Sequence, residues 1–509
     1  MRGPHNIWRL IRTGATLERT GALRMVLDAM DAPLSLRIAA HVIGRPFRWL
    51  GYRGDPDLPP LVRALTALGP AYIKFGQILS TRPDVVGEEL AGQLRVLQDK
   101  LPPFPLETAR ASIAEGIGRD VDEIFSDLGP PVAAASIAQV HRAIRARDGA
   151  AVAVKVLRPG IEQAFRRDID AFYFAAAVVE ALLPGTRRLR PVDVIAHFEG
   201  VVQGELDLRL EAASASEFRE NTEDDPGFRV PQVDWQLSAR RVLTLEWAEG
   251  IPIHDLAALR KAGHDLGRLG ERVLELFLRH ALRDGLFHAD MHQGNLMVAG
   301  NGDIIALDFG IMGHIDDYTR RVYAEILYGF IQQDYRRVAE VHFEAGYVPA
   351  DRDIDEFSRA LRAVGEPIFG ASANQISMAH LLGYLFEVTE RFGMQTRTEL
   401  ILLQRTMVVV EGVARSLNPD INIWHVARPI VETYIRDNIG PAALLRDLAK
   451  TARALSRLAP RLPALAEDTL LRRTTAPDEP AARPGPGAAG WVALGAALAI
   501  AAIALAGGP

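Results

Sequence analysis

The sequence predicts an α+β fold of two lobes, with a helical N-terminal extension and an apolar C-terminal tail that crosses a membrane. The first observation is the order of its patterns. Short runs rich in Val and Leu precede a stretch from Asp316 to Ile439 that is almost wholly helical in pattern, and strands grouped before helices are typical of α+β chains. The length of 509 residues allows two or more domains. The third observation is an uncharged run from Gly487 to Gly508.

Composition narrows the function classes. Hydrophobic residues make up 48% and charged residues 24%, a globular balance that excludes fibrous, wholly disordered and polytopic membrane chains. The net charge is −6, whereas a nucleic-acid-binding protein is normally basic, so we expect no nucleic-acid partner. The chain has no cysteine, which rules out disulfides, thiolate metal sites and cysteine nucleophiles.

Residues 1–60 form a basic region that we expect to be helical. Nine arginines stand against three acidic residues in positions 1–53, and Trp8 and Trp49 lie among them. A basic segment with tryptophan can lie on an anionic membrane surface. The same pattern suits a helical extension packed on a later domain, and the sequence leaves both interpretations open.

Three segments follow the helical lobe. Residues 441–476 carry leucines at steps of mostly three and four with basic residues between them, so we expect amphipathic basic helices that pack on the core or on lipid. Residues 477–486 are rich in Pro and Ala and are expected to be a linker. Residues 487–508 are uncharged and reach the length of about 20 residues that a transmembrane helix needs. The alternative for this last segment is a disordered Ala/Gly tail.

The flanks of the tail predict its orientation. Arg472, Arg473 and Arg483 precede the apolar run, and only Pro509 follows it. Because basic residues stay on the cytoplasmic side, we expect a C-terminal tail anchor with the catalytic part in the cytoplasm.

The strongest chemical signal is the run His288-Ala-Asp290-Met-His292-Gln-Gly-Asn295, followed by a β-like run and then Asp308-Phe-Gly. Phosphoryl transfer needs one carboxylate to position or deprotonate the attacking hydroxyl, and an amide with a second carboxylate to hold Mg²⁺ on the phosphates. We therefore predict Asp290 as the catalytic residue, Asn295 and Asp308 as Mg²⁺ ligands, and ATP or ADP as the nucleotide. The alternative is metal-free hydrogen bonding in an ordinary loop.

Two histidines in this run invite a zinc interpretation. His288 and His292 stand four apart, but no HExxH motif is present and Gly294 disfavours a helix there. We interpret His288 as a hydrogen bonder that holds the loop, and we assign no role to His292.

Three runs in the middle of the chain are predicted strands: Ala150–Val156, Arg241–Glu246 and Asp303–Leu307. The first contains Lys155 among apolar residues, and a buried ammonium needs an anionic partner. In kinases such a lysine contacts the nucleotide phosphates and a helix glutamate, which we predict to be Glu211. The alternative is a lysine at a strand edge that faces water.

A loop that covers the phosphates is expected before this lysine. The segment there is rich in alanine and has no glycine, so it can present backbone N–H groups, but with a stiffer grip than a glycine-rich loop. The predicted nucleotide-binding residues are Lys155 and the members of this Ala-rich loop: Val132, Ala133, Ala134, Ala135, Ser136, Ile137, Ala138, Gln139 and Val140.

These features, together with Lys74-Phe-Gly76-Gln77 upstream and the motif Glu205-Leu-Asp207, resemble the UbiB family of atypical kinase-like proteins, which is linked to ubiquinone biosynthesis. The resemblance implies a bilobal protein-kinase-like fold. It also implies regulatory or structural roles for Lys74, Gly76, Gln77, Glu205, Asp207 and Glu211. The domains it implies are a KxGQ helical extension at 61–125, an N-lobe with the Ala-rich loop at 126–250 and a helical C-lobe at 251–440.

The function implied by the resemblance is a kinase or ATPase at the cell inner membrane that is required for ubiquinone biosynthesis or regulates it. Its target is expected to be a small molecule or lipid, such as a prenylated quinone precursor, rather than a protein in trans. Other ubiquinone-biosynthesis proteins are possible partners. Two alternatives remain. One is a nucleotide-gated scaffold that binds prenyl lipids, and the other is a small-molecule kinase similar to aminoglycoside phosphotransferases.

The motif residues also have a physical interpretation. Lys74 and Gln77 are three apart, so on a helix they share one face, and Gly76 lets another backbone or a nucleotide come close. By family resemblance this extension folds over the catalytic cleft.

One long helix is predicted over His197–Arg219. On a regular helix Glu205 and Glu211 would point about 120° apart, and so toward different partners. We expect Glu211 to meet Lys155, and Glu205 with Asp207 to face the KxGQ motif.

Two departures from common patterns matter for the target. The frequent family form HxDPHPGN has prolines where this chain has Met291 and Gln293. No Ala-Pro-Glu follows Asp308-Phe-Gly, which leaves little room for a segment that docks peptides. We therefore expect no protein phosphorylation in trans.

Overall fold

The computed structural model describes residues 6–29, 45–80, 88–94, 102–182, 190–370 and 398–440, with short pieces between them at 34, 38, 42, 96–97, 388 and 391–394. The chain divides into a compact unit Met1–Arg436 and a second unit Asp437–Pro509. The predicted segments 441–476, 477–486 and 487–508 lie outside the described residues, so the membrane tail stays a prediction. Within the described part, no helix combines the length and the apolar character needed to cross a membrane.

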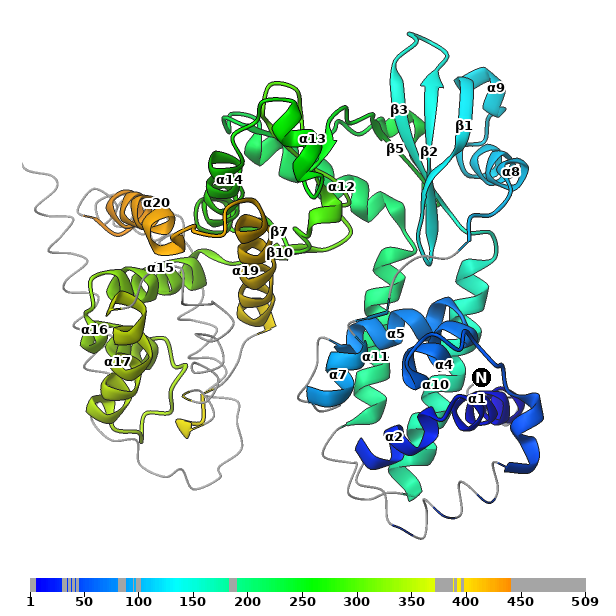
Figure 1. Cartoon of the computed structure of the whole chain (residues 1–509), viewed down its shortest axis with the longest axis horizontal. Helices are drawn as coiled ribbons and strands as arrows, with labels where there is room; N and C mark the ends of the chain where they lie inside the picture. The colour runs from blue at the N-terminus through cyan, green and yellow to red at the C-terminus, as the bar shows by residue number, and fades with distance from the viewer. Residues whose placement is uncertain are drawn as a thin grey trace, which may run out of the picture. The chain divides into compact units, whose positions relative to one another are not determined.

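A four-stranded antiparallel sheet in the order β1-β2-β3-β5 forms the N-lobe (Figure 1). The helix α8 (Leu106–Ile117) packs on this sheet, and apolar residues of both build one core. The short helix α9 (Val121–Ile124) leads into the first strand. The strands are β1 (Phe125–Ala134), β2 (Ala138–Arg145), β3 (Ala151–Leu157) and β5 (Val242–Glu246).

The alternation of β3 explains the position of its lysine. Val152, Val154 and Val156 are buried in the core beneath α8. Because successive side chains of a strand point to opposite faces, Lys155 lies on the other face of the sheet. The three predicted strands are confirmed as β3, β5 and β9 (Ile304–Ala306), to within one residue at each end.

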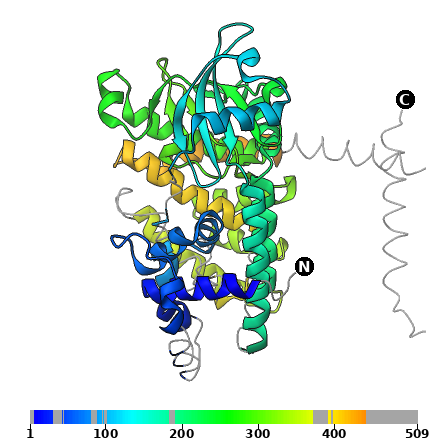
Figure 2. The same cartoon turned by 90° about the vertical axis from the view of Figure 1, so that its right-hand side faces the viewer.

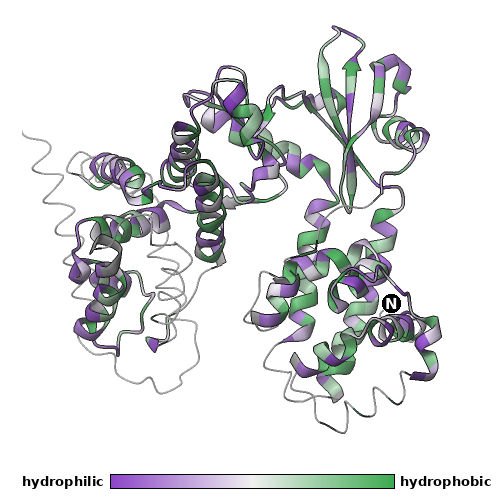
Figure 3. Ribbon diagram, in the orientation of Figure 1, coloured by the Kyte–Doolittle hydropathy of each residue, from purple (hydrophilic) through white to green (hydrophobic). Residues whose placement is uncertain are grey.

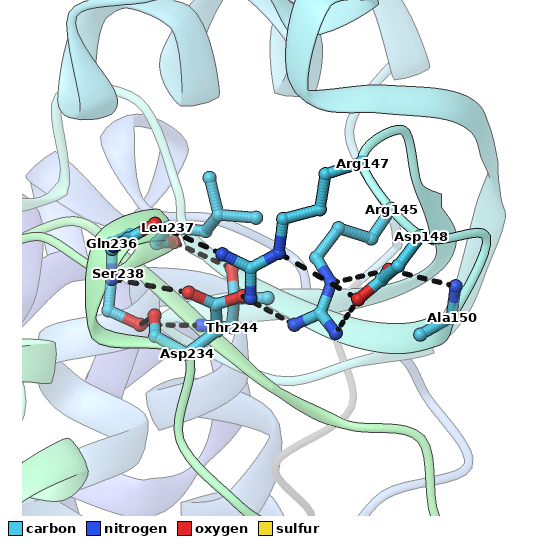
Figure 4. Close-up of polar contacts among 9 residues, drawn as sticks. All are labelled: Arg145, Arg147, Asp148, Ala150, Asp234, Gln236, Leu237, Ser238 and Thr244. Atoms are coloured by element: carbon cyan, nitrogen blue, oxygen red, sulfur yellow. Dashed lines mark hydrogen bonds and ion pairs between the residues drawn. The ribbon is translucent and has the colours of Figure 1, made fainter.

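A polar network fastens the turn between β2 and β3 (Figure 4). Arg145 and Arg147 both contact the buried carboxylate of Asp234, at 2.6 and 3.0 Å. Arg145 also pairs with Asp148 at 2.6 Å. Since Asp234 precedes β5, the network ties this turn to the chain that enters the fourth strand, at the end of β2 opposite the Ala-rich turn.

The N-terminal helices form a bundle with two helices that follow β3 in the chain. Tyr72 and Phe75 of α5 pack against Phe172 of α10, and Phe75 also meets Phe198 of α11. Helix α1 lies across α10 (Figure 2). Hydrophobic and hydrophilic residues alternate along these helices (Figure 3), as expected of amphipathic helices around a core. The bundle consists of α1 (Ile7–Thr20), α2 (Ala22–Ala29), η2 (Arg45–Leu50), α4 (Pro60–Leu68), α5 (Pro70–Ser80), α7 (Glu88–Leu94), α10 (Ile161–Leu182) and α11 (Pro191–Glu205).

The single helix predicted over His197–Arg219 is two helices. Helix α11 ends at Glu205, and α12 (Leu208–Thr222) begins after a short break. Asp207 caps α12, because its carboxylate accepts the N–H of Arg209. Aspartate favours this position since its side-chain oxygen satisfies an N–H that has no partner within the helix.

The C-lobe carries a sheet in the order β4-β9-β8-β6 and a strand pair β10-β7, surrounded by helices. The helical pattern predicted from Asp316 onward is confirmed where the structure describes it, and Asp316 is the N-cap of α15. The remaining elements are β4 (Phe228–Arg229), η4 (Trp235–Leu237), β6 (Ile251–Pro252), α13 (Leu256–Lys261), α14 (Leu266–Arg279), η5 (His280–Asp284), β7 (Leu286–His288), η6 (Gln293–Asn295), β8 (Leu296–Val298), β10 (Met312–His314), α15 (Asp317–Ile331), α16 (Tyr335–Glu344), α17 (Ile354–Gly370), α19 (Thr398–Leu417) and α20 (Ile423–Asn438).

Candidate active site

Lys155 lies between two carboxylates. Its Nζ donates to both oxygens of Glu211, at 2.8 and 2.9 Å, and to Oδ1 of Asp308 at 3.2 Å. The three residues come from β3, from the first turn of α12 and from the chain after β9. The expected contact between Lys155 and Glu211 is confirmed. A water-facing strand edge is excluded, because the lysine side chain is only 17% exposed.

The three charges do not balance. Burial raises the pKa of Glu211 to about 7, and the charge of Lys155 opposes this shift. The charge of Lys155 holds the pKa of Asp308 at about 2. Burial would lower the pKa of Lys155, but the carboxylates of Asp308 and Glu211 outweigh it and raise the pKa. One ammonium serves two carboxylates, and Glu211 is the one whose charge is less well compensated.

The loop that carries Asp290 is held by its own side chains. Asn295 Nδ2 donates to the backbone carbonyl of Asp290 at 3.0 Å and lies 3.4 Å from its Oδ2. Nδ1 of His288 accepts the N–H of Asp290 at 3.1 Å, and its Nε2 lies 3.0 Å from the carbonyl oxygen of Leu307. The structural role predicted for His288 is therefore confirmed. The side chain of Asp290 is 35% exposed, so a substrate can reach it.

His292 shapes the same loop. Its Nδ1 accepts the N–H of Gly294 at 2.9 Å and starts the short turn η6. Its Nε2 lies 3.7 Å from Oδ2 of Asp290. The imidazole is thus a neighbour of the candidate catalytic carboxylate.

Asp308 is placed by the strand pairing behind it. Strands β8 and β9 pair antiparallel, and the N–H of Leu307 donates to the carbonyl of Asn295 at 2.8 Å, so Asp308 emerges beside Asn295. Its φ is +58°, a left-handed backbone that non-glycine residues rarely adopt. Its Oδ1 accepts the N–H of Gly310 at 3.3 Å as well as a proton of Lys155.

Phe309 links this segment to α12. Its ring centroid lies 5.5 Å from that of His288 and 6.1 Å from that of Phe218. The ring of Phe218 in turn lies 5.0 Å from His280. Because α12 also carries Glu211, this aromatic cluster connects the position of Glu211 to the loop that carries Asp290, which we call the candidate catalytic loop.

Helix α19 supports the candidate catalytic loop through two hydrogen bonds. Thr406 Oγ1 donates to the carbonyl of Ala289 at 3.1 Å, and Gln293 Nε2 donates to Ser416 Oγ at 2.8 Å. Met291 is buried. The two residues that replace the prolines of the frequent family form are thus fixed by packing and by a hydrogen bond.

The predicted loop over 132–140 is mostly a β-hairpin, which corrects the sequence interpretation. Residues 132–134 belong to β1 and residues 138–140 to β2, so only 135–137 form a turn. A 2.8 Å hydrogen bond between the two flanks closes this turn. A segment rich in alanine shows no alternation of large apolar and polar residues, so the sequence gives no signal for strands over 132–140.

Arg158, just past β3, holds this turn. Its guanidinium donates to the carbonyl of Ala135 from Nε at 3.1 Å and from Nη2 at 2.9 Å, and Nη2 also donates to the carbonyl of Pro102 at 3.0 Å. The guanidinium lies 5.6 Å from the ring centroid of Phe104. The segment before α8 is therefore fastened to the Ala-rich turn.

Gln139 faces the same segment. Its Oε1 accepts the N–H of Phe104 at 3.0 Å, and its Nε2 lies 3.3 Å from the carbonyl oxygen of Phe104 and 2.8 Å from Nε2 of His141. His141 Nδ1 lies 2.8 Å from the carbonyl oxygen of Gly129. The side chain of Gln139 is thus used within the protein, and its residue is paired in the sheet with Ala134 and Val156, so its nucleotide contact stays a prediction.

The KxGQ motif meets the end of α11. Lys74 Nζ lies 2.6 Å from Oε1 of Glu205, with both side chains largely buried. The expected contact of Glu205 is confirmed. The expectation for Asp207 is wrong, because its carboxylate pairs with Arg209 at 2.6 Å while it caps α12. Gln77 lies half-buried on α5.

The groups that come close to Gly76 are leucine side chains. We expected another backbone or a nucleotide there, so this expectation is corrected. A Cβ at this position would lie 2.4 Å from Leu97 Cδ1 and 2.7 Å from Leu65 Cδ1. Glycine here lets α5 pack closely against α4 and the segment after α7.

Comparisons with known proteins identify the family. The ABC1 atypical kinase-like domain matches residues 96–342, and the UbiB helical domain matches residues 361–422. A "Probable protein kinase UbiB" of Marinobacter nauticus is 42% identical over 422 residues, which cover 82% of this chain and 77% of the relative. The chain belongs to the UbiB family. A second relative called "Probable protein kinase UbiB", from Azotobacter vinelandii, is 40% identical over 459 residues, or 89% of this chain and 85% of the relative.

A solved structure shares the fold. The complex of Rv3197 with erythromycin from Mycobacterium tuberculosis covers 78% of this UbiB chain and 98% of its own, at 26% identity and a TM-score of 0.50. The family and the kinase-like fold predicted from the sequence are therefore confirmed.

Sequence reasoning missed several residues that shape this UbiB site. Phe218 stands seven residues after Glu211, two turns along the same helix face, and that spacing was a usable signal. Arg158 follows a predicted strand, but no sequence feature indicates which carbonyl groups it meets. Arg405 of α19 was also missed. Partial loss of water around the guanidinium lowers its pKa although the residue is exposed, and the charge of Asp290 partly offsets this effect.

The oxygen donors of the UbiB site fit Mg²⁺. Asp308 supplies a carboxylate, and Asn295 keeps its amide oxygen for a ligand because its Nδ2 is engaged by Asp290. Mg²⁺ is typically held by one or two such protein oxygens together with substrate phosphates and water. Among the residues that the structure describes, no group of three or more His, Asp or Glu side chains forms a self-contained metal site.

Proposed function

We propose that the protein is a membrane-associated UbiB-type kinase or ATPase that binds Mg-ATP or Mg-ADP and serves ubiquinone biosynthesis. The observation that carries the proposal is the convergence of Glu211 and Asp308 on Lys155, at 2.8 and 3.2 Å, next to the loop of Asp290. A strand lysine paired with a helix glutamate, beside an aspartate that follows a strand, is the arrangement that kinases use for phosphoryl transfer.

Each site residue has a role that its surroundings support. Lys155 contacts the nucleotide phosphates, and Glu211 keeps its ammonium in place. Asn295 and Asp308 would hold Mg²⁺, which offsets the charge of the phosphates when bound. Asp290 orients the acceptor hydroxyl and takes its proton as the phosphoryl group is transferred.

The acceptor we propose is a small molecule or a lipid, such as a prenylated quinone precursor, or water. Only residues 311–316 separate Gly310 from the start of α15, which is short for a segment that docks a peptide. The contacts of Arg158 and Gln139 with the segment before α8 favour a narrow approach. The erythromycin complex of the mycobacterial relative is a precedent for a small molecule on this fold.

The membrane anchor we propose is residues 487–508. Deletion from Gly487 onward should move most of the protein to the soluble fraction. Release of the intact protein by salt alone would contradict the anchor and indicate peripheral binding.

The deciding experiment for the reaction measures ATP turnover with membranes that contain a prenylated phenol, for the natural chain and for Asp308→Asn. We expect Mg²⁺-dependent turnover that rises with the prenylated phenol and is lost in the variant. A phosphorylated phenol would identify a kinase, and phosphate release alone an ATPase. Nucleotide-dependent binding of the phenol without any ATP turnover would contradict the proposed enzymatic activity and favour the alternative of a lipid-binding scaffold.

A cellular experiment addresses the pathway. Lipid analysis of a strain that carries Asp308→Asn should show one accumulated prenylated ring intermediate, which would mark the blocked step. An unchanged quinone profile would contradict a role in ubiquinone biosynthesis.

A further inference from the structure

Exposed apolar side chains concentrate near the start of the described chain. Among the described residues, eight of the sixteen large hydrophobic residues that are exposed fall within the first 52 positions, and the rest are spread from Val96 to Ile401. Exposed apolar side chains that lie together on a surface mark an interaction site, whereas single scattered ones do not. The eight are Ile7, Trp8, Leu34, Ile38, Val42, Phe47, Trp49 and Tyr52.

The backbone under the aromatic members is fixed. Arg19 Nη1 donates to the carbonyl of Gly51 at 2.6 Å, and the N–H of Tyr52 donates to Thr16 Oγ1 at 3.1 Å. A Cβ on Gly51 would lie 2.3 Å from the carbonyl oxygen of Ala15, so η2 packs tightly on α1. Trp49 is nevertheless 74% exposed. Its exposure is therefore a property of the folded surface and not of a frayed end.

Helix α1 uses its other side for packing. Arg9 forms an ion pair with Asp168 of α10, and Thr13 Oγ1 lies 2.7 Å from the hydroxyl of Tyr72 on α5. The helix is thus docked on the bundle, as one of the two sequence interpretations holds, while Trp8 remains more than half exposed.

The charge around these aromatics is positive. Residues 6–29 and 45–53 contain seven arginines and two acidic residues, of which Glu18 is buried. Asp28 lies 3.7 Å from Arg24. The exposed arginines are Arg12, Arg24, Arg45, Arg48 and Arg53.

We propose that this N-terminal face, formed by the exposed residues of α1, η2 and Tyr52, docks on a membrane surface that carries anionic lipid headgroups. Tryptophan prefers the headgroup level because its ring is apolar and its N–H is polar. Each arginine near an anionic surface strengthens binding by about fivefold. A second copy of the chain would bring like charges together, which disfavours self-association through this face. The proposal goes beyond the function proposed above and depends on neither the nucleotide site nor the tail.

The test is hydrogen exchange of the backbone amides of residues 45–53 in the full-length protein. One sample contains phosphatidylcholine vesicles, and the other contains vesicles in which about a third of the lipid is phosphatidylglycerol. We expect exchange to slow by about tenfold on the anionic vesicles at low salt. Because salt screens the attraction, the effect should vanish at high salt. Equal exchange with both kinds of vesicle would overturn the proposal.

Variants separate this face from the other parts of the molecule. The double variant Arg45→Glu/Arg48→Glu should lose the slowed exchange, whereas Trp235→Ser, which removes an exposed tryptophan of η4, should keep it. Slowing that grows with protein concentration in the absence of vesicles would show self-association and overturn the proposal. Protein that stays on phosphatidylcholine vesicles through its tail, with unchanged exchange at 45–53 on either lipid, would also overturn it. Failure to bind phosphatidylcholine at all would contradict only the tail anchor.

Discussion

Two lysine–glutamate pairs flank the break between α11 and α12, and they differ in their surroundings. Lys74 meets Glu205 at 2.6 Å and joins two helices of the extension bundle. Lys155 meets Glu211 at 2.8 Å, but its ammonium also contacts Asp308. The first pair is a brace between packed helices, whereas the second is a site with more negative than positive charge.

The comparison shows how the extension is connected to the site. Glu205 is the last residue of α11, and Glu211 lies in the first turn of α12, so only Leu206 and Asp207 separate the two helices. We call this the α11–α12 joint. We infer that a displacement of the Lys74 pair is passed through the joint to Glu211, the glutamate that holds Lys155.

The largest expected effect comes from removing the shared ammonium. Lys155→Met leaves two carboxylates without it, and breaking a buried pair costs about 3–5 kcal/mol of unfolding free energy. A carboxyl whose pKa is higher in the folded state than in the unfolded state stabilises the fold at low pH, and this contribution is lost as pH rises through the folded pKa. Since the pKa of Glu211 is about 7, above its ordinary 4.5, and should rise further without Lys155, the loss should be larger at pH 8 than at pH 5. Denaturant unfolding at both pH values measures it.

The control for this variant also removes the negative charge of Glu211, which Lys155→Met leaves without the lysine ammonium. Lys155→Met/Glu211→Gln should recover part of the stability at pH 8. Equal destabilisation at both pH values, with no recovery in the double variant, would show that the poorly compensated charge of Glu211 is not the cause of the lost stability.

The second prediction concerns the metal side of the same site. Asp308→Asn should weaken Mg-nucleotide affinity by more than about 100-fold, because even outer-sphere partners of a metal contribute about 10–100-fold. The asparagine tolerates the left-handed backbone, so the fold should persist. Calorimetric titration with ADP and Mg²⁺ measures the affinity, and an unchanged value would refute the assignment of Asp308.

The third prediction tests the brace. Lys74→Met should lower the unfolding free energy by about 1–3 kcal/mol, because it removes the ammonium that pairs with the largely buried carboxylate of Glu205. Through the joint, it should also change nucleotide affinity and raise autophosphorylation. Glu205→Gln should have the same effects, and the double variant should add little to either. If both single variants destabilise the protein while nucleotide affinity stays the same, the α11–α12 joint does not pass a displacement of the Lys74 pair to the nucleotide site.

The smallest expected effect is at the Ala-rich turn. Arg158→Lys keeps the charge but loses the forked contact with the carbonyl groups of Ala135 and Pro102, which should change nucleotide affinity by about fivefold. Arg142→Lys is the matched control, because Arg142 stacks on Trp247 and does not contact the turn. Equal effects of the two variants would show that the fork at Arg158 has no special role. Titration of a fluorescent nucleotide measures both.

The sequence predicted the parts of the site that chemistry prescribes. Asp290, Asn295 and Asp308 were found by their order and spacing, and Lys155 by the cost of burying a charge in an apolar strand. The structure confirms the contacts with Glu211 and Glu205. The binding roles of these residues and of the 132–140 segment stay predictions.

The parts that were missed depend on three-dimensional packing. The break before α12 follows from the capping of that helix by Asp207. A single aspartate within a helical pattern does not reveal that a new helix begins there. Gly76 was given a partner of the wrong kind, because the sequence does not show which side chains approach a glycine. Arg158 acts through backbone carbonyl groups, which every residue has, so its partners carry no sequence signal.

The support of the catalytic loop by α19 has a consequence during synthesis. The carbonyl of Ala289 accepts its hydrogen bond from Thr406, which is 117 residues later in the chain, and Gln293 donates its hydrogen bond to Ser416, which is also later. At the ribosome this separation corresponds to roughly 6–23 s of elongation. A nascent chain that already contains the whole ABC1 domain therefore still lacks these two supports of the candidate catalytic loop. These two hydrogen bonds can form only after the part of the UbiB helical domain that carries Thr406 and Ser416 has emerged.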